Sequence, residues 1–333
     1  MLKYSILVLV SLLGVACQDR MAHRILSEED IKNLPQASAI AAPAKIDPIT
    51  KRIVLDNGQP NTDTIAIAFD GQYHWLTEDY QIQTSLSAQV PVPHRYRRIA
   101  VEKGSYAEWL RFLPMLPKGT TVKLHDGSVK SYQAGAYQVV NIDIGKRDLQ
   151  QCADAVMRLR AEYLYSKKQY SDIHFNYTSG HTINYSDWVV GKRPRVKGNK
   201  VYFSNKNEAA KADYSYFVFR EYLQSIYLYA GTSSLNQEMN VRRLENMQVG
   251  DVFIKGGFPG HAMIVLDMAQ SMDNDEKVFL LGQSYMPAQS IHIVNNFHDL
   301  ELSPWYAISQ IQEELITPEW TFESNQLKTF QKK

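Results

Sequence analysis

The sequence predicts an α+β fold in which a central helix packs on an antiparallel sheet. Two long helical patterns occupy residues 148–164 and about 213–230. Four strand patterns follow the second helix, at 251–254, 261–268, 277–284 and 290–294. Helices that precede a run of closely spaced strands are typical of this class, because such strands pair as an antiparallel meander.

The composition is that of an ordinary globular protein. The 333 residues are 44% hydrophobic and 21% charged, with a net charge of +1. This balance gives no indication of a nucleic-acid partner, which usually requires a basic excess, and we predict none. Lys255-Gly256-Gly257 precedes a strand rather than a helix, so no phosphate-binding loop is predicted. His292 and His298 stand on separate elements, and the sequence predicts neither a metal site nor a cofactor.

The N-terminal residues predict export. Residues 1–4 form a short basic start, and residues 6–15 form an apolar run too short to span a bilayer. Gly14-Val15-Ala16-Cys17 resembles a bacterial lipobox, which implies a membrane-anchored lipoprotein of the cell envelope with lipid on Cys17. The alternative is an ordinary small-x-small cleavage site and a soluble secreted protein. Lipidation of Cys17 would leave Cys152 without a disulfide partner.

The remaining patterns divide the chain into four parts. We predict a targeting segment at 1–17, a linker at 18–46, a single α+β domain at 47–325 and a tail at 326–333. Within the domain, residues 178–230 are predicted to contain a large insertion. The shorter elements expected are strands at 64–69, 121–124, 137–142 and 172–177, and a helix that begins after Ser105 and ends before Pro114.

The helix at 148–164 carries the first candidate site residue. Asp148 is a good N-cap and Gln151 completes a capping-box pattern, which places Cys152 in the first turn. At this fourth helical position the unpaired N–H groups and the positive end of the helix dipole favour a thiolate. The alternative is a small core residue, because a cysteine on an apolar helix face is most often one.

The two faces of this helix differ in charge. Arg160 lies on the apolar face with Cys152, and a buried cation needs an anionic partner, which is either structural or a ligand. The opposite face carries charged side chains spaced for i,i+4 pairing, namely Asp154, Arg158 and Glu162.

A second candidate site residue follows a glycine-rich loop. Gly250-Asp251 opens a strand, and Gly260-His261 opens the next strand after Gly256-Gly257-Phe258-Pro259. This arrangement resembles the NlpC-type papain-like cysteine hydrolases. The resemblance implies that Cys152 is the nucleophile, His261 the base and Gln283 the group that orients the imidazole. The residues around Cys152 lack the Asp-Cys-Ser-Gly-type motif of those enzymes. The alternative for His261 is a hydrogen-bonded structural histidine.

A second resemblance covers roughly residues 90–325. The chain is similar to the domain-of-unknown-function family 4846, and the blocks that carry the likeness include 148–154, 229–235, 250–254, 283–289, 303–306 and 317–320. That family implies an envelope lipoprotein and no defined activity.

Together these patterns predict a papain-like core and a thiol-dependent hydrolase or acyl transferase acting on amide bonds. Peptidoglycan stem peptides are the expected substrate class, with Arg160 and Tyr285 as ligand contacts. The alternative is a non-catalytic envelope lipoprotein that serves as a binding or assembly module.

Overall fold

A computed structural model of the chain describes residues 45–47, 52–54, 69, 71–204 and 211–331. The predicted targeting segment with Cys17, nearly all of the linker and nearly all of the predicted strand at 64–69 lie outside the described residues. Among the described helices, none combines the length and apolarity needed to cross a bilayer.

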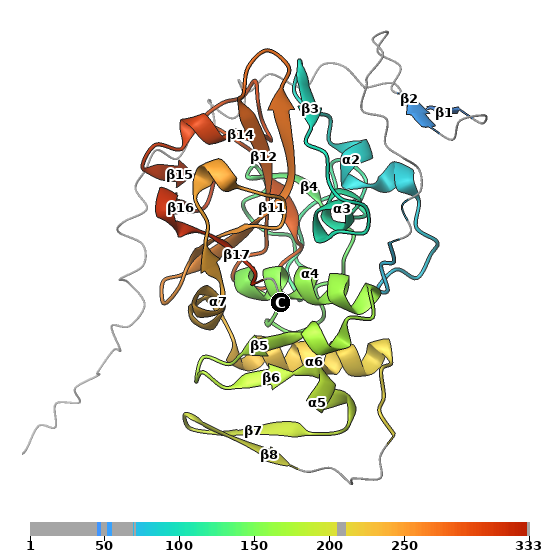
Figure 1. Cartoon of the computed structure of the whole chain (residues 1–333), viewed down its shortest axis with the longest axis vertical. Coiled ribbons are helices and arrows are strands. Elements are labelled where there is room, and N and C mark those ends of the chain that lie inside the picture. The colour runs from blue at the N-terminus through green and yellow to red at the C-terminus, as the bar shows by residue number, and fades with distance from the viewer. Residues whose placement is uncertain (1–44, 48–51, 55–68, 70, 205–210, 332–333) are drawn as a thin grey trace, which may run out of the picture.

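The main sheet is antiparallel throughout its pairings (Figure 1). Its order is β4 (Ala136–Val139), β13 (His292–Val294), β12 (Lys277–Gln283), β11 (His261–Ser271), β10 (Val252–Lys255), β17 (Leu327–Thr329) and β9 (Asn240–Val241). Two further strands join it from the side: β3 (Tyr96–Arg98) pairs with β11, and β14 (Tyr306–Ala307) pairs with β12. The four strands predicted after residue 250 are therefore confirmed as β10 to β13, and so is the α+β class.

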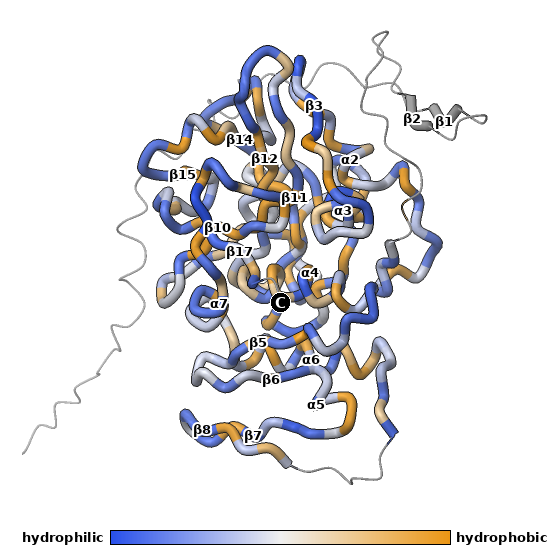
Figure 2. Tube along the Cα trace, in the orientation of Figure 1, coloured by the Kyte–Doolittle hydropathy of each residue, from blue (hydrophilic) through white to orange (hydrophobic). Residues whose placement is uncertain are grey.

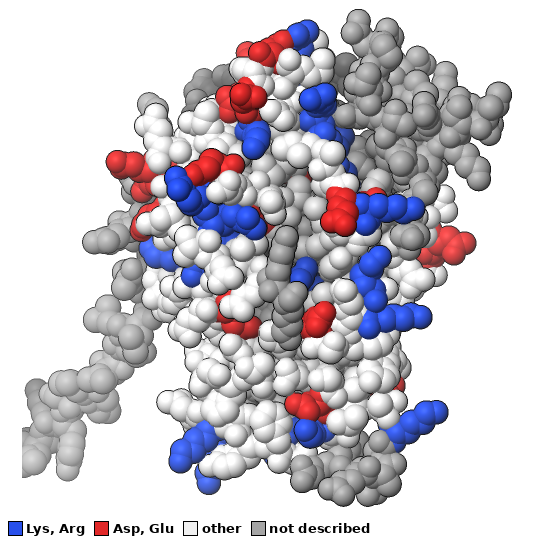
Figure 3. Space-filling view, viewed as in Figure 1, with Lys and Arg blue, Asp and Glu red and all other residues white. Residues whose placement is uncertain are grey.

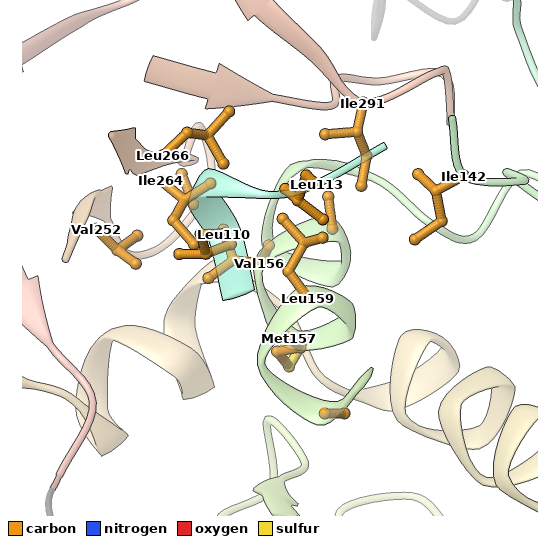
Figure 4. Close-up of a cluster of buried hydrophobic side chains, with 14 of the residues drawn as sticks. Leu110, Leu113, Ile142, Val156, Met157, Leu159, Val252, Ile264, Leu266 and Ile291 are labelled. Atoms are coloured by element: carbon orange, nitrogen blue, oxygen red, sulfur yellow. The ribbon is translucent and has the colours of Figure 1, made fainter. Parts of the chain in front are cut away.

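The two faces of the sheet bury separate hydrophobic cores. Along β11, Ala262, Ile264 and Leu266 belong to one cluster, and Met263 and Val265 belong to the other. This separation follows from the period of two in a β-strand. Figure 4 shows Ile264 and Leu266 among the side chains of the first cluster, with residues of two helices beside them.

The predicted helix that carries Cys152 is α4 (Cys152–Ser166), and it packs on β11 through the first cluster. A second long helix, α6 (Tyr216–Tyr229), packs against α4 (Figure 1). Arg158 and Glu162 form the expected i,i+4 ion pair at 3.3 Å. Both side chains are fully buried, so the predicted charged face is not a solvent face. The sequence pattern of α4 does not predict burial on both sides, because burial of the polar side depends on α6. That helix brings Tyr216 and Arg220 to the polar side.

Smaller elements complete the fold. They are β1 (Lys45–Asp47), β2 (Arg52–Val54), α2 (Leu86–Gln89), α3 (Tyr106–Arg111), α7 (Thr232–Glu238), β15 (Glu314–Ile316) and β16 (Thr321–Glu323). Short 3₁₀ turns lie at Ile82–Thr84, Tyr170–Asp172, Leu244–Asn246, Ile308–Gln310 and Ser324–Gln326. The helix after Ser105 is confirmed as α3, and the Ser105 side chain accepts from the Glu108 N–H. The predicted strand at 121–124 is wrong, since Lys123 and Leu124 form only isolated bridges.

Residues 174–204 form small hairpins beyond α6. β5 (His174–Asn176) pairs with β6 (Thr182–Asn184), and β7 (Arg193–Lys197) pairs with β8 (Lys200–Ser204), with α5 (Tyr185–Val189) between the two pairs. Figure 2 shows the mixed hydropathy of β7 and β8 at this end of the molecule. The long polar segment therefore adds structure to one end of the molecule and does not extend the main sheet.

Candidate functional site

The start of α4 differs in detail from the predicted cap. The N-cap residue is Gln151, and its backbone N–H donates to the Asp154 carboxylate at 3.1 Å. The Asp148 carboxylate instead accepts from the Gln151 side chain at 3.0 Å and from the Ala288 N–H at 2.7 Å. Asp148 thereby ties the helix start to the loop after β12, and Cys152 is the first helical residue rather than the fourth.

Cys152 is a half-buried residue and carries a free thiol. The nearby backbone N–H groups of Ala153, Ala262 and Cys152 favour the thiolate. Burial has the larger effect, and with the nearby Asp154 it raises the pKa of the thiol to about 11. The expected low-pKa thiolate is therefore wrong for this conformation, because the desolvation of the anion outweighs three N–H donors.

His261 and Gln283 lie together as predicted. The His261 Nε2 atom is 2.9 Å from Gln283 Oε1. The Gln283 Nε2 atom donates to Glu319 Oε2 at 2.8 Å and lies 3.3 Å from His292 Nε2. An amide nitrogen can only donate, so the amide oxygen must accept from His261. This network assigns the His261 proton to Nε2 and leaves Nδ1 with a lone pair.

The same network extends to two residues that sequence analysis did not select. Lys130 Nζ contacts Glu319 Oε2 at 2.5 Å, and both side chains are largely buried. His292 Nδ1 lies 2.9 Å from the Ser290 carbonyl, so Nδ1 donates there and Nε2 is free to accept from Gln283. Lys130 and Glu319 are 189 residues apart. A pairing at that separation leaves no local pattern, although Glu319 stands in one of the blocks that resemble family 4846.

Aromatic rings enclose the imidazole of His261. Its centroid lies 4.8 Å from that of Tyr285, 5.3 Å from Trp320 and 5.9 Å from Phe322. Burial lowers the pKa of His261 to about 4, and the Gln283 hydrogen bond opposes this shift only in part. The imidazole is therefore neutral at neutral pH. The predicted ligand contact Tyr285 also lies at the site, with Lys130 Nζ 5.8 Å from its ring centroid.

Cys152 and His261 come near each other along β11 without bonding. The N–H of Ala262, the residue directly after His261, lies near enough to the sulfur to lower the pKa of the thiol. The His261 ring, however, shares its sheet face with Met263 and packs against Phe322, whereas α4 lies on the face of Ala262. Within the described residues, no hydrogen bond joins the thiol to the imidazole.

Arg160 has aromatic partners in place of the expected anion. Its guanidinium lies 5.1 Å from the Tyr106 ring centroid, 5.6 Å from that of Tyr163 and 5.4 Å from that of Phe330. No salt bridge of Arg160 occurs in the part of the chain that the structure describes. The rings offset part of the free-energy cost of removing the cation from water, because their faces carry negative potential.

No grouping of three or more His, Cys, Asp or Glu side chains suited to a metal ion occurs among the described residues. His292 instead donates and accepts within the Gln283 network, which gives it a structural role that does not require a metal.

Comparison with known proteins gives a family and no closer relative. No curated protein matches the chain. No solved structure matches it either. A family model matches residues 86–329, a span that contains Cys152, His261, Gln283 and the whole Lys130–Glu319 network. The chain therefore belongs to the family described as Domain of unknown function (4846).

Proposed function

We propose that the protein is a thiol-dependent hydrolase or acyl transferase acting on amide bonds, built on a papain-like core. One observation carries this proposal. The Cys152 sulfur at the start of α4 reaches the backbone of β11 one residue from His261, whose ring is held by Gln283. A helix-terminal thiol, an imidazole and a polar orienting group in this chain order are the parts that thiol catalysis needs.

The resting state on this proposal is a neutral pair. The proposal requires that substrate binding bring the sulfur and Nδ1 of His261, which lie on opposite faces of β11 here, into hydrogen-bond distance around the start of that strand. The imidazole takes the thiol proton while the sulfur attacks the amide carbonyl carbon. It then gives that proton to the leaving amine, which departs as the thioester forms. Water, or an acceptor amine, releases the acyl group with His261 again acting as base.

Peptidoglycan stem peptides are the proposed substrates, because the predicted lipobox would place the protein in the cell envelope. The test uses the full chain in detergent with purified muropeptides and mass spectrometry of the products. Cys152→Ala should abolish cleavage, and His261→Ala should slow it by roughly 10²–10⁴-fold. His94→Ala, an exposed histidine outside the site, is the matched control. Cleavage that persists in Cys152→Ala would exclude the thiol as nucleophile.

The second candidate is a non-catalytic binding or assembly lipoprotein. The raised thiol pKa, about 11, and the lowered imidazole pKa, about 4, favour it. Iodoacetamide labelling of the native protein separates the two functions. A catalytic pair should label near neutral pH faster than His261→Ala does, because the imidazole assists removal of the thiol proton. A thiol that labels only on unfolding, with no effect of His261→Ala, would favour the binding protein.

The envelope location has its own test. Cys17→Ser should abolish the incorporation of labelled fatty acid, since a hydroxyl cannot form the thioether of a lipoprotein. Labelled lipid on Cys17→Ser would contradict the anchor but would leave the hydrolase proposal intact.

A further inference from the structure

A cleft of about 520 Å³ lies in the polar insertion, away from the Cys152 and His261 elements. Three segments form it: the turn between β5 and β6, the turn between β7 and β8, and the C-terminal end of α6 (Figure 1). Its lining includes Tyr177, Thr178, Ser179, Gly198, Asn199 and Tyr229. The cleft therefore combines aromatic rings with amide and hydroxyl groups.

Two tyrosines whose rings pack at an angle of 47° give the cleft its aromatic surface. Tyr177 is 1% exposed, and its hydroxyl lies 2.5 Å from Ser225 Oγ on α6. The Tyr229 ring lies 5.0 Å from it, centroid to centroid, and is 41% exposed. A half-exposed ring supported by a buried one presents a flat apolar face to solvent at a fixed position.

Backbone hydrogen bonds hold the walls of the cleft in place. The Thr178 N–H donates to the Tyr229 carbonyl at 2.8 Å, which joins the β5–β6 turn to the end of α6. The Tyr177 N–H donates to the His181 carbonyl at 3.0 Å, and Ser179 Oγ lies 3.1 Å from His181 Nδ1. Such preorganisation reduces the entropy lost when a ligand binds.

Cations surround the third wall. β7 and β8 contain Arg193, Arg195, Lys197 and Lys200 and no acidic residue. Arg193 is engaged, with its guanidinium 4.1 Å from the Trp188 ring centroid. The other three are exposed and form no salt bridge within the described residues. Figure 3 shows Lys and Arg side chains, with acidic atoms among them, at the lower end of the molecule, which carries this hairpin. An anionic group next to the cleft would be attracted there.

We propose that this cleft binds a saccharide that carries a carboxylate. The Tyr229 ring would stack on the apolar face of a sugar ring, and the Asn199 amide and Thr178 hydroxyl would bond to its hydroxyl groups. Lys197 and Lys200 flank the turn that holds Asn199, and they would attract the carboxylate. A mixed lining of this kind, in which a few polar groups orient a ligand on an aromatic surface, is typical of small-ligand sites.

The test uses the full chain in detergent on an array of neutral and carboxylate-bearing oligosaccharides, followed by calorimetric titration of the strongest binder. Wild type should prefer the carboxylate-bearing glycans. Tyr229→Ala should weaken binding about tenfold or more, and Tyr229→Phe should retain it, because the ring provides the contact. A Lys197→Gln, Lys200→Gln double variant should lose the preference for the carboxylate.

The matched control is Tyr202→Ala, which removes a 54% exposed tyrosine of β8 outside the cleft lining and should leave binding unchanged. If Tyr229→Ala fails to fold, exposed Asn199→Ala provides the second variant and should also weaken binding. Failure to bind any carboxylate-bearing glycan, equal binding of neutral glycans, or unchanged binding by the cleft variants would overturn the proposal. Because Cys152→Ala should bind as wild type does, this outcome is separate from that of the hydrolase proposal.

Discussion

The Nε2 atom of His261 lies 2.9 Å from the Oε1 atom of Gln283, and the two residues occupy the same face of neighbouring strands. The orientation of this amide is not free, because its nitrogen donates to the Glu319 carboxylate at 2.8 Å. Lys130 in turn neutralises Glu319. The chain Lys130–Glu319–Gln283 therefore determines which imidazole nitrogen of His261 carries the proton.

The first prediction concerns that tautomer. Nitrogen NMR of the imidazole at pH 7 should show His261 protonated at Nε2 and unprotonated at Nδ1. Gln283→Leu removes the acceptor and should produce a mixture of both tautomers. Gln89→Leu, an exposed glutamine outside the site, should leave the His261 spectrum unchanged. A dominant Nδ1–H form in wild type would show that the amide has the opposite orientation.

The second prediction concerns acid stability. Burial lowers the pKa of His261 to about 4 and that of His292 to about 3, from an ordinary value of 6.5. Between pH 6.5 and the lowered pKa values, the unfolded chain binds more protons than the folded one. The contribution of these histidines to stability is therefore full above pH 6.5 and falls as the pH drops toward 4. Chemical denaturation across this range should show a smaller decline for His292→Gln than for wild type. An equal decline in both proteins would mean that His292 is not protonated on unfolding.

Parts of this network and of the fold could be predicted from the sequence, for physical reasons. The strands from β10 to β13 are largely apolar runs separated by turns rich in glycine, proline, aspartate or asparagine, so local patterns locate them. His261 and Gln283 follow from chain order along adjacent strands. Lys130 and Glu319 do not, because their pairing depends on tertiary contacts alone. The raised thiol pKa of Cys152 also depends on burial by tertiary packing, which cannot be predicted from the position of the residue in its helix.

The third prediction concerns Arg160, whose partners are aromatic rather than anionic. Arg160→Met keeps the apolar stem and loses the cation–π attraction, and should cost about 0.5–1 kcal/mol of unfolding free energy. Arg160→Ala loses both and should cost more, because the stem also covers apolar surface. Urea denaturation of the two variants gives the comparison. If Met and Ala variants are equally stable, the stem contributes nothing. If Met alone abolishes binding of a muropeptide at unchanged stability, the charge serves a ligand.

The last prediction concerns Asp267. This residue follows an irregularity in β11, where the pairing with β12 shifts register between Val265 and Asp267. Its carboxylate is fully buried and accepts from Arg98 Nε at 2.7 Å and from Arg111 Nε at 2.8 Å. Asp267→Ala leaves two largely buried guanidinium groups without their anion, so it should cost about 3–5 kcal/mol. The matched control is Asp273→Ala at the hairpin tip, where the carboxylate pairs with an exposed arginine, Arg95. Water and salt screen that pair, and its loss should leave stability unchanged within error. Urea denaturation of both variants measures the difference. Equal stability of the two would mean that Arg98 and Arg111 find other acceptors, as their bonds to the Val90 and Ile99 carbonyls would then suffice.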